Sequence, residues 1–93
     1  LEQLMNSICE NPVKIFGIKK KGFIKEGFDA DFTIVDMNKK IVIKNENIES
    51  KCGWSPFDGH TFKGTPVSTI INGQIKMRDG KILGDPEGRP LKF

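Results

Sequence analysis

The chain has few of the residues on which several kinds of protein chemistry depend. Its 93 residues include two cysteines, one histidine, one tryptophan and no tyrosine. Two cysteines are too few for the disulfide framework of a small secreted domain, so a reducing compartment, the cytoplasm, is favoured. A complete (β/α)₈ barrel needs about 250 residues, and the length of this chain excludes one.

Long apolar runs and an excess of one charge are lacking too. No apolar stretch approaches the roughly 18 residues of a membrane span, so we expect no membrane contact. Fifteen basic and twelve acidic residues give a formal charge of +3, without the positive stripe that binds a phosphate backbone, and we expect no nucleic-acid partner. The densest basic run, Lys19-Lys20-Lys21, is typical of a solvated turn, with a polyanion contact as the alternative.

The first residues have the apolar pattern of a helix. Residues at i, i+3, i+4 and i+7 are apolar and share one stripe: Leu1, Leu4, Met5 and Ile8. Asn11-Pro12 predicts a break, with Asn11 as the N-cap of a second short turn over residues 12–16. Gly17 is placed to end this turn in the left-handed conformation. The pattern already includes Leu1, so we expect the chain to be a segment of a longer polypeptide.

The remainder has the pattern of short antiparallel strands. Runs rich in β-branched and aromatic residues predict strands over residues 23–24, 32–36, 41–43, 67–71, 74–77 and 81–83. Met37-Asn38-Lys39 and the stretch 54–59 are predicted turns, and residues 45–53 a loop. Asn72-Gly73 predicts a two-residue hairpin with a type I′ turn. From Gly84 the proline- and glycine-containing tail indicates an irregular arm.

These patterns predict a mainly β protein with an N-terminal helix. Residues 1–18 form the helical part, and residues 19–93 form a β module that ends in the extended tail 84–93. A chain this short buries only about 60% of its unfolded surface, and the sheet edges and the helical stripe need a cover. We expect that cover to come from another segment of the polypeptide or from a second copy, as a homo-oligomer or a strand-swapped pair.

No constellation in the sequence is a self-sufficient active site. A zinc site needs three or four ligands, and Cys9, Cys52 and His60 match no common spacing. A Cys52–His60 nucleophile pair would need an orienting third group. Asp29 and Asp31 would lie on the same side of a strand, which allows paired-carboxylate chemistry but is more typical of side chains that bind backbone N–H groups at a turn.

Two further patterns have structural explanations that are favoured over functional ones. The glycines at 22 and 27 are not followed by the Lys-Ser or Lys-Thr of a phosphate-binding loop. Trp54 and the seven phenylalanines could stack on bases, but the phenylalanines occur singly in strand and turn contexts and most are expected in a core. We therefore predict no catalytic, cofactor-binding or metal-binding residue in the chain.

Several runs, taken in order, resemble the amidohydrolase superfamily. Residues 11–17 (Asn-Pro-Val-Lys-Ile-Phe-Gly), 22–27 and 29–36 (Asp-Ala-Asp-Phe-Thr-Ile-Val-Asp) look like its C-terminal passage. Residues 51–59 (Lys-Cys-Gly-Trp-Ser-Pro-Phe-Asp-Gly), Lys63-Gly64, 66–73 and the tail 84–90 with Phe93 are similar to the end of the dihydroorotase family. The Ser-Pro-Phe loop is shared with allantoinase-like relatives, and the Gly-Arg-Pro tail favours dihydroorotase.

The resemblance implies a zinc enzyme that reversibly cyclises N-carbamoyl-aspartate to dihydroorotate in pyrimidine biosynthesis. The metal ligands of that family, a His-x-His pair among them, are absent from this chain, so it would be inactive by itself. Residues 1–18 resemble the final helix of the catalytic barrel, and residues 19–93 the C-terminal part of a composite β-sandwich. The expected partner is the remainder of the same polypeptide, the barrel and the N-terminal sandwich strands.

Other interpretations stay open at the level of the sequence. The whole protein could be an allantoinase, a hydantoinase, a dihydropyrimidinase or a homologue without metal ligands, because these share the sandwich. The chain could also be an independent small β module that binds a protein or a nucleic acid. The near-balanced charge is unfavourable for nucleic acid, and the unpartnered helical stripe is unfavourable for independence.

Overall fold

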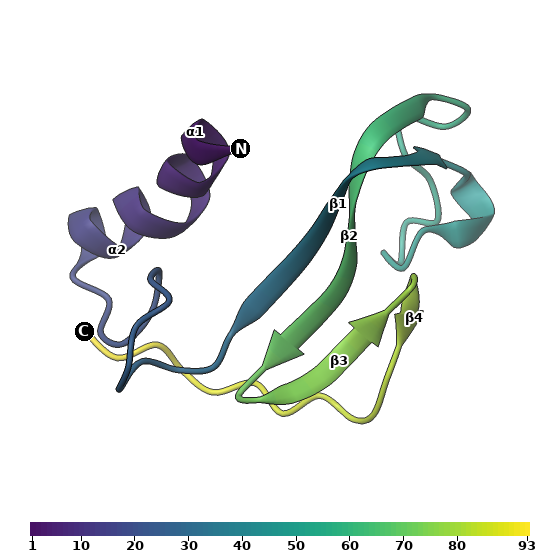
Figure 1. Cartoon of the computed structure of the whole chain (residues 1–93). Helices are drawn as coiled ribbons and strands as arrows, with labels where there is room; N and C mark the ends of the chain where they lie inside the picture. Colours follow the sequence, from purple (N-terminus) through teal and green to yellow (C-terminus); the bar gives the residue numbers. More distant parts are fainter.

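The computed structural model describes all 93 residues and has an N-terminal helix beside a four-stranded antiparallel sheet (Figure 1). The predicted fold class is therefore confirmed. The strands follow one another across the sheet in the order of the chain. The elements are α1 (Glu2–Met5), a π-helical turn (Asn6–Glu10), α2 (Asn11–Phe16), β1 (Phe32–Val42), a 3₁₀ turn (Asn45–Asn47), β2 (Thr61–Ile71), β3 (Gln74–Arg78) and β4 (Lys81–Ile82). None of the helices has the length and apolar character that crossing a bilayer requires.

The helical part is continuous, and the break predicted at Asn11-Pro12 is wrong. Asn11 has helical angles, φ −62° and ψ −45°, and no side chain caps α2. Pro12 removes one N–H from the helical ladder, and the preceding turn widens so that the Asn11 N–H bonds to the Asn6 carbonyl. A π-turn thus accommodates the proline without ending the helix. The left-handed end at Gly17 is confirmed, with φ 65°.

The loop after the helix folds back against it. Residues 23–24, predicted as a strand, lie in this loop and pair with nothing in the sheet, so that prediction is wrong. Phe23 instead packs edge-on against Phe28, with ring centroids 6.3 Å apart. Gly22 approaches the helix so closely that a Cβ there would lie 2.5 Å from Val13 Cγ2 and 2.8 Å from the Cys9 carbonyl oxygen. This approach fixes the angle at which the chain leaves the helix.

Gly22→Ala should destabilise the protein more than Gly27→Ala. Both glycines have φ +84°, so both variants incur about 1–2 kcal/mol for a left-handed alanine. Only Gly22 meets neighbouring atoms, which adds about 1–3 kcal/mol of overpacking. Thermal unfolding of the two variants measures the difference, and equal midpoints would contradict the close approach.

β1 is a single strand, where two strands and a turn were predicted, and its register with β2 shifts at two places, after Ile34 and after Asp36. Asp36 is opposite Thr65 and Lys40 is opposite Lys63, so residues 37–39 face only Gly64. Asp36 Oδ1 accepts hydrogen bonds from the N–H groups of Asn38 (2.9 Å) and Lys39 (3.2 Å). The turn chemistry at Met37-Asn38-Lys39 is present, but it closes a bulge, and the chain continues along the same partner.

The second half of the sheet is built from two tight hairpins. Asn72 and Gly73 have φ 50° and 77°, which confirms the type I′ turn between β2 and β3. Asp79 and Gly80, with φ 49° and 79°, make an equivalent turn into β4. β2 begins at Thr61, earlier than the predicted residue 67, because its first half pairs with the end of β1.

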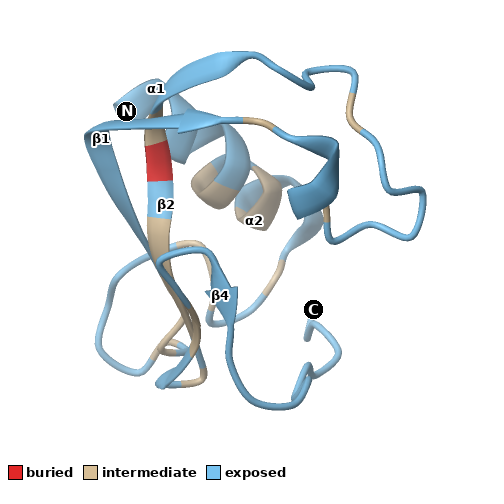
Figure 2. Cartoon of the chain, turned by 90° about the vertical axis from the view of Figure 1, so that its right-hand side faces the viewer, coloured by how far each residue is buried: buried red, intermediate tan, exposed pale blue.

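The chain has no hydrophobic core of its own. Thr65 in β2 is its only buried residue, and Ile24, Ile15 and Phe93 are 85%, 74% and 67% exposed (Figure 2). The accessible surface of 7740 Å² exceeds the about 5,400 Å² of a compact protein of this mass. The radius of gyration is 15.0 Å, where a compact chain has about 12 Å. The helix and the sheet thus form an open arrangement with uncovered apolar faces.

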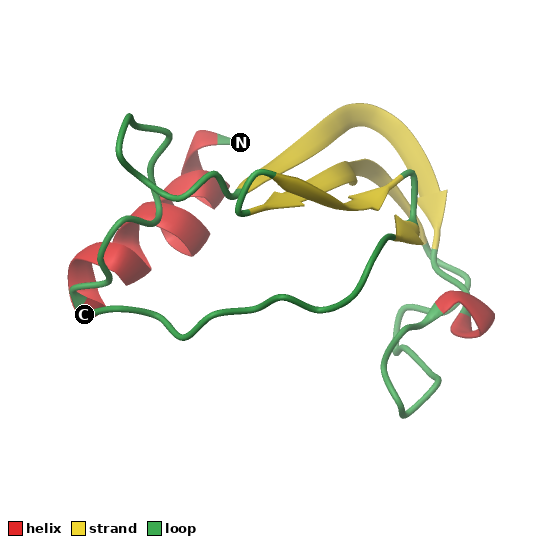
Figure 3. Cartoon of the chain, turned by 90° about the horizontal axis from the view of Figure 1, so that it is seen from below, coloured by secondary structure: helices red, strands yellow, loops and turns green.

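The tail closes one side of this open arrangement. After β4 it runs without helix or strand back to the end of the helical part (Figure 3). The Lys19 N–H donates to the Lys92 carbonyl at 2.7 Å, which joins the tail to the residues that follow α2. Lys76 Nζ in β3 holds the start of the tail, since it lies 3.0 Å from both Glu87 Oε2 and the Asp85 carbonyl oxygen.

Candidate functional site

The three predicted sulfur and imidazole candidates have separate structural surroundings. Cys9 lies in the π-turn, and the Cys52 thiol donates to the Trp54 carbonyl at 3.5 Å. The His60 ring packs against Phe57 and Phe62, with centroids 6.0 and 6.3 Å away. No group of three or more His, Cys, Asp or Glu side chains comes together as metal ligands would. The residues present therefore do not fit a zinc ion, and Cys52 and His60 are not oriented by a third group.

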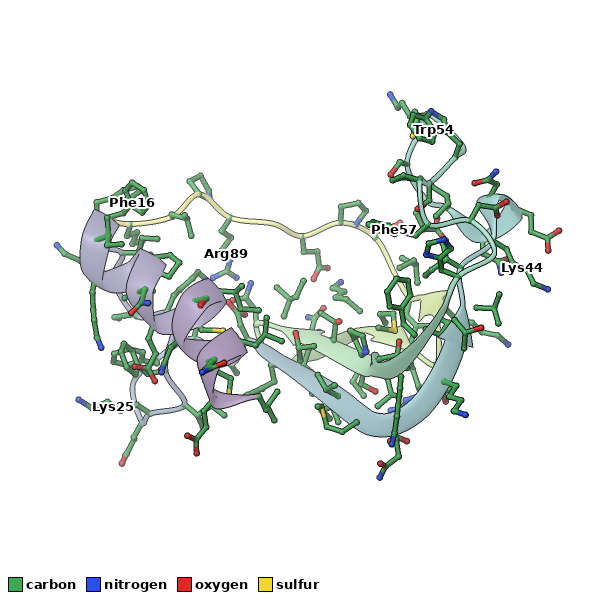
Figure 4. All side chains as sticks on the ribbon, turned by 90° about the horizontal axis from the view of Figure 1, so that it is seen from above. Phe16, Lys25, Lys44, Trp54, Phe57 and Arg89 are labelled. Atoms are coloured by element: carbon green, nitrogen blue, oxygen red, sulfur yellow. The ribbon has the colours of Figure 1, made fainter.

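Residues 44–60 form a loop that polar side chains organise. The Asn45 N–H donates to Asp58 Oδ1 at 2.8 Å, and Asn45 Oδ1 accepts from the Ser55 N–H at 2.9 Å. Ser55 Oγ in turn accepts from the Phe57 N–H at 3.1 Å. Trp54 lies at the outer end of the loop, away from the sheet (Figure 4), and is 60% exposed. The Ser-Pro-Phe motif thus shapes a loop and brings no reactive groups together.

Asp29 and Asp31, the candidate carboxylate pair, do lie on the same side, where Lys21 binds both. Lys21 Nζ lies 3.0 Å from Asp29 Oδ2 and is also hydrogen-bonded to Asp31 Oδ2. Asp31 Oδ1 accepts the N–H of Asn72 at 2.9 Å, and the adjacent Gly73 N–H donates to the Ala30 carbonyl. We call Lys21, Asp29 and Asp31 the lysine clasp. It connects the helix exit to the β2–β3 hairpin.

The electrostatics of the lysine clasp match a structural role. The hydrogen bond from Lys21, and then the one from the Asn72 N–H, lower the pKa of Asp31 below its usual 3.8. The hydrogen bonds to Asp31 and then to Asp29 raise the pKa of Lys21 above 10.5. Both groups are held in their charged forms, which is the reverse of a general acid or base tuned to titrate near neutral pH. Lys21 and Asp31 are therefore not arranged for proton transfer.

The lysine clasp should stabilise the protein over a wide pH range, and this stabilisation should be lost in strong acid and in strong base. A lowered carboxylate pKa contributes stability above pH 3.8 that is lost as the pH falls through the pKa of the folded state. The raised pKa of Lys21 contributes stability that is lost only as the pH rises above 10.5. Asp31→Asn should therefore lower stability by a constant amount near neutral pH, and the difference from wild type should shrink below pH 3.8.

Asp79→Asn is the matched control for Asp31→Asn. It removes the same charge from a hairpin turn where Asp79 makes no ion pair. Denaturant unfolding across the pH range measures both variants. A difference between Asp31→Asn and wild type that persists unchanged in acid would contradict the assignment of the lysine clasp.

One cavity lies between the sheet and the tail. This cavity of about 520 Å³ is bounded by β3, β4 and residues 82–88, with Ile71, Met77, Ile82 and Leu83 as its apolar side chains. Lys76, the basic side chain that lines it, is already bound to Glu87. A second cavity, of about 420 Å³, lies between Lys19–Lys21 and the end of the tail. In the second cavity Lys21 and Asp29 are paired with each other.

The sequence of this chain is similar to those of known proteins. The amidohydrolase family matches residues 1–76 of the chain. The chain belongs to the amidohydrolase family. Dihydroorotase from Pyrococcus furiosus is 46% identical over 91 residues, which cover 98% of this chain and 22% of that protein. Dihydroorotase from Methanothermobacter thermautotrophicus is 41% identical over 83 residues, 89% of this chain and 19% of that protein.

Other amidohydrolases are also similar. Allantoinase from Desulfitobacterium hafniense is 40% identical over 79 residues, 85% of this chain and 18% of that protein. The solved structure of an L-hydantoinase (dihydropyrimidinase) from Arthrobacter aurescens matches 91% of this chain and 19% of its own, with a TM-score of 0.86 and 35% identity. The chain thus spans about a fifth of the length of the amidohydrolases it matches. The resemblance to the amidohydrolase superfamily and to its dihydroorotases is confirmed.

Sequence reasoning missed the partner of the two carboxylates. Lys21 was assigned to a solvated basic run, whereas it is about 70% covered and binds Asp29 and Asp31. The available signal was a basic run followed by two alternating aspartates. Lys21 reaches the two aspartates only because the loop 18–31 folds back on itself, and no local periodicity in the sequence predicts that fold.

Proposed function

We propose that the chain is a non-catalytic scaffold segment of a dihydroorotase-like amidohydrolase that acts in the cytoplasm in pyrimidine biosynthesis. The similarity to dihydroorotase over 98% of the chain, together with coverage of only 22% of that protein, carries this proposal. The other four-fifths of such a protein exceeds the about 250 residues that a (β/α)₈ barrel needs. The reactive groups would lie there.

The surface of the chain supports a scaffold role. Its accessible area exceeds that of a compact protein of its mass by about 2,300 Å², which is the scale of obligate interfaces. The exposed stripe of the helix and the open faces of the sheet would be covered by other parts of the polypeptide. In this proposal residues 1–18 are the final helix of the barrel, and residues 19–93 complete a β-sandwich.

The chemistry of the proposed reaction needs groups that this chain does not bring together. Zinc, when bound in such an enzyme, activates a water and polarises the amide carbonyl of the cyclic substrate. Asp29 and Asp31 are bound by Lys21, the Cys52 thiol donates to the Trp54 carbonyl, and the His60 ring packs against Phe57. The residues of this chain therefore support the fold and take no part in bond making.

An allantoinase, hydantoinase or dihydropyrimidinase is the second candidate for the whole protein. The allantoinase similarity and the TM-score of 0.86 with the L-hydantoinase favour it. All these enzymes would share this scaffold, so discrimination between cyclic amides lies in residues outside the chain. An independent β module is disfavoured, because a sheet without a buried hydrophobic side chain is not a stable domain.

Separating the chain from the rest of its protein tests the scaffold role. The two parts, expressed apart, should each fail to hydrolyse dihydroorotate above a zinc-only blank, and mixing them should restore activity. Allantoin and hydantoin, tested with the mixed parts, distinguish the second candidate. Hydrolysis by residues 1–93 alone, or full activity of the other part alone, would refute the proposal.

The isolated chain should also associate with itself. β1 is an eleven-residue edge strand, and unpaired edges beside exposed apolar faces favour pairing between copies. Sedimentation velocity of residues 1–93 should show dimers or larger species, which addition of the remaining part of the protein converts to a single complex. A stable compact monomer would contradict this.

A further inference from the structure

The cavity of about 420 Å³ lies where the helix exit meets the returning tail. Lys19, Lys20 and Lys21 form one wall, and residues 88–92 form the other. The backbone hydrogen bond from Lys19 to Lys92, 2.7 Å long, joins the two walls. Asp29, with Ile71 and Asn72 of the β2–β3 hairpin, completes the lining. Three segments that are far apart in the sequence therefore meet here.

The net charge of the chain is concentrated around this cavity. Five basic residues line it: Lys19, Lys20, Lys21, Arg89 and Lys92. Of these, only Lys21 makes an ion pair, and it binds both carboxylates of the lysine clasp. Asp29 also lines the cavity, so its lining residues carry a formal charge of +4. Asp31, which is bound to Lys21 but does not line the cavity, brings the local sum to +3, the formal charge of the whole chain. The remaining residues are balanced.

The four other basic side chains have no acidic partner in the structure. The other ion pairs of the chain are Lys14–Glu10, Lys44–Glu46 and Lys76–Glu87, all outside this cavity. Like charges gathered without a counter-charge repel one another, and an anion placed between them removes that repulsion. The backbone hydrogen bond between Lys19 and Lys92 holds these two exposed residues next to each other.

Arg89 gives the cavity its most specific donor. Its side chain extends inward from the tail, toward the space between the helix and the sheet (Figure 4). The planar guanidinium presents parallel N–H groups that match the two oxygens of a carboxylate or a phosphate. Pro90 follows it and limits the backbone freedom of the tail at that point.

We propose that this cavity is an anion-binding site that takes a carboxylate or phosphate group, with Arg89 as the bidentate donor. Lys19, Lys20 and Lys92 neutralise the remaining charge of the anion. The volume is within the about 300–1,000 Å³ of ligand pockets and accepts a small polyanion. The same chemistry serves an acidic side chain from a segment that covers this face. The site is independent of the catalytic role proposed for the whole protein.

Arg89→Gln and Arg78→Gln in the full-length protein form the decisive pair. Arg78, at the end of β3, also has no ion pair and does not line the cavity, so the two variants lose the same charge. Titration with inorganic phosphate and pyrophosphate, followed by calorimetry at two salt concentrations, measures binding. Arg89→Gln should weaken pyrophosphate binding about tenfold, as expected for lost hydrogen bonds to a charged group, and Arg78→Gln should change it little.

A thermal measurement distinguishes the two sources of the anion. If an acidic side chain of the protein fills the site, neither phosphate nor pyrophosphate binds, and Arg89→Gln lowers the unfolding temperature more than Arg78→Gln does, by an amount that high salt reduces. Binding that is lost in Arg89→Gln supports a free anion. Equal behaviour of the two variants in both measurements would overturn the proposal.

Discussion

Backbone pairing along β2 is the interaction on which the rest of this structure depends. β2 is hydrogen-bonded to β1 on one side and to β3 on the other, and it holds Thr65, the one buried residue. The chain has 42 backbone–backbone hydrogen bonds, where a compact domain of this length has about 60. Since no hydrophobic side chain is buried, these ladders and a few polar clusters fix the fold, and apolar surface remains for other residues to cover.

Polar clusters hold segments of this chain together, as a hydrophobic core does in most domains. The lysine clasp ties the helix exit to the β2–β3 hairpin, and Asn45, Ser55 and Asp58 shape the loop 44–60. Their hydrogen bonds are directional and work in partly exposed positions, where apolar contacts would contribute little. Acidic and amide side chains that suggest catalysis in isolation are thus used to hold backbone in place.

Local signals in the sequence predicted what local chemistry determines. The positive φ angles at Gly17, Asn72 and Gly73 follow from residue type, and the structure has each of them. The errors at Asn11-Pro12 and at residues 37–39 have one cause. A proline or a turn-forming triplet can be absorbed as a π-turn or a bulge when the chain on either side continues to pair, and that depends on partners distant in sequence. The lysine clasp was missed for the same reason, because a fourteen-residue loop brings its parts together.

In the proposed scaffold role the reactive groups lie outside this chain, which explains why so little of the function is visible in it. The similarity of this chain to dihydroorotase, allantoinase and hydantoinase alike fits the proposal that substrate choice depends on residues elsewhere in the protein. The scaffold role does not explain the basic cavity beside the tail. Five basic residues line it, of which only Lys21 is ion-paired, and an anion placed among them would reduce the repulsion between their charges.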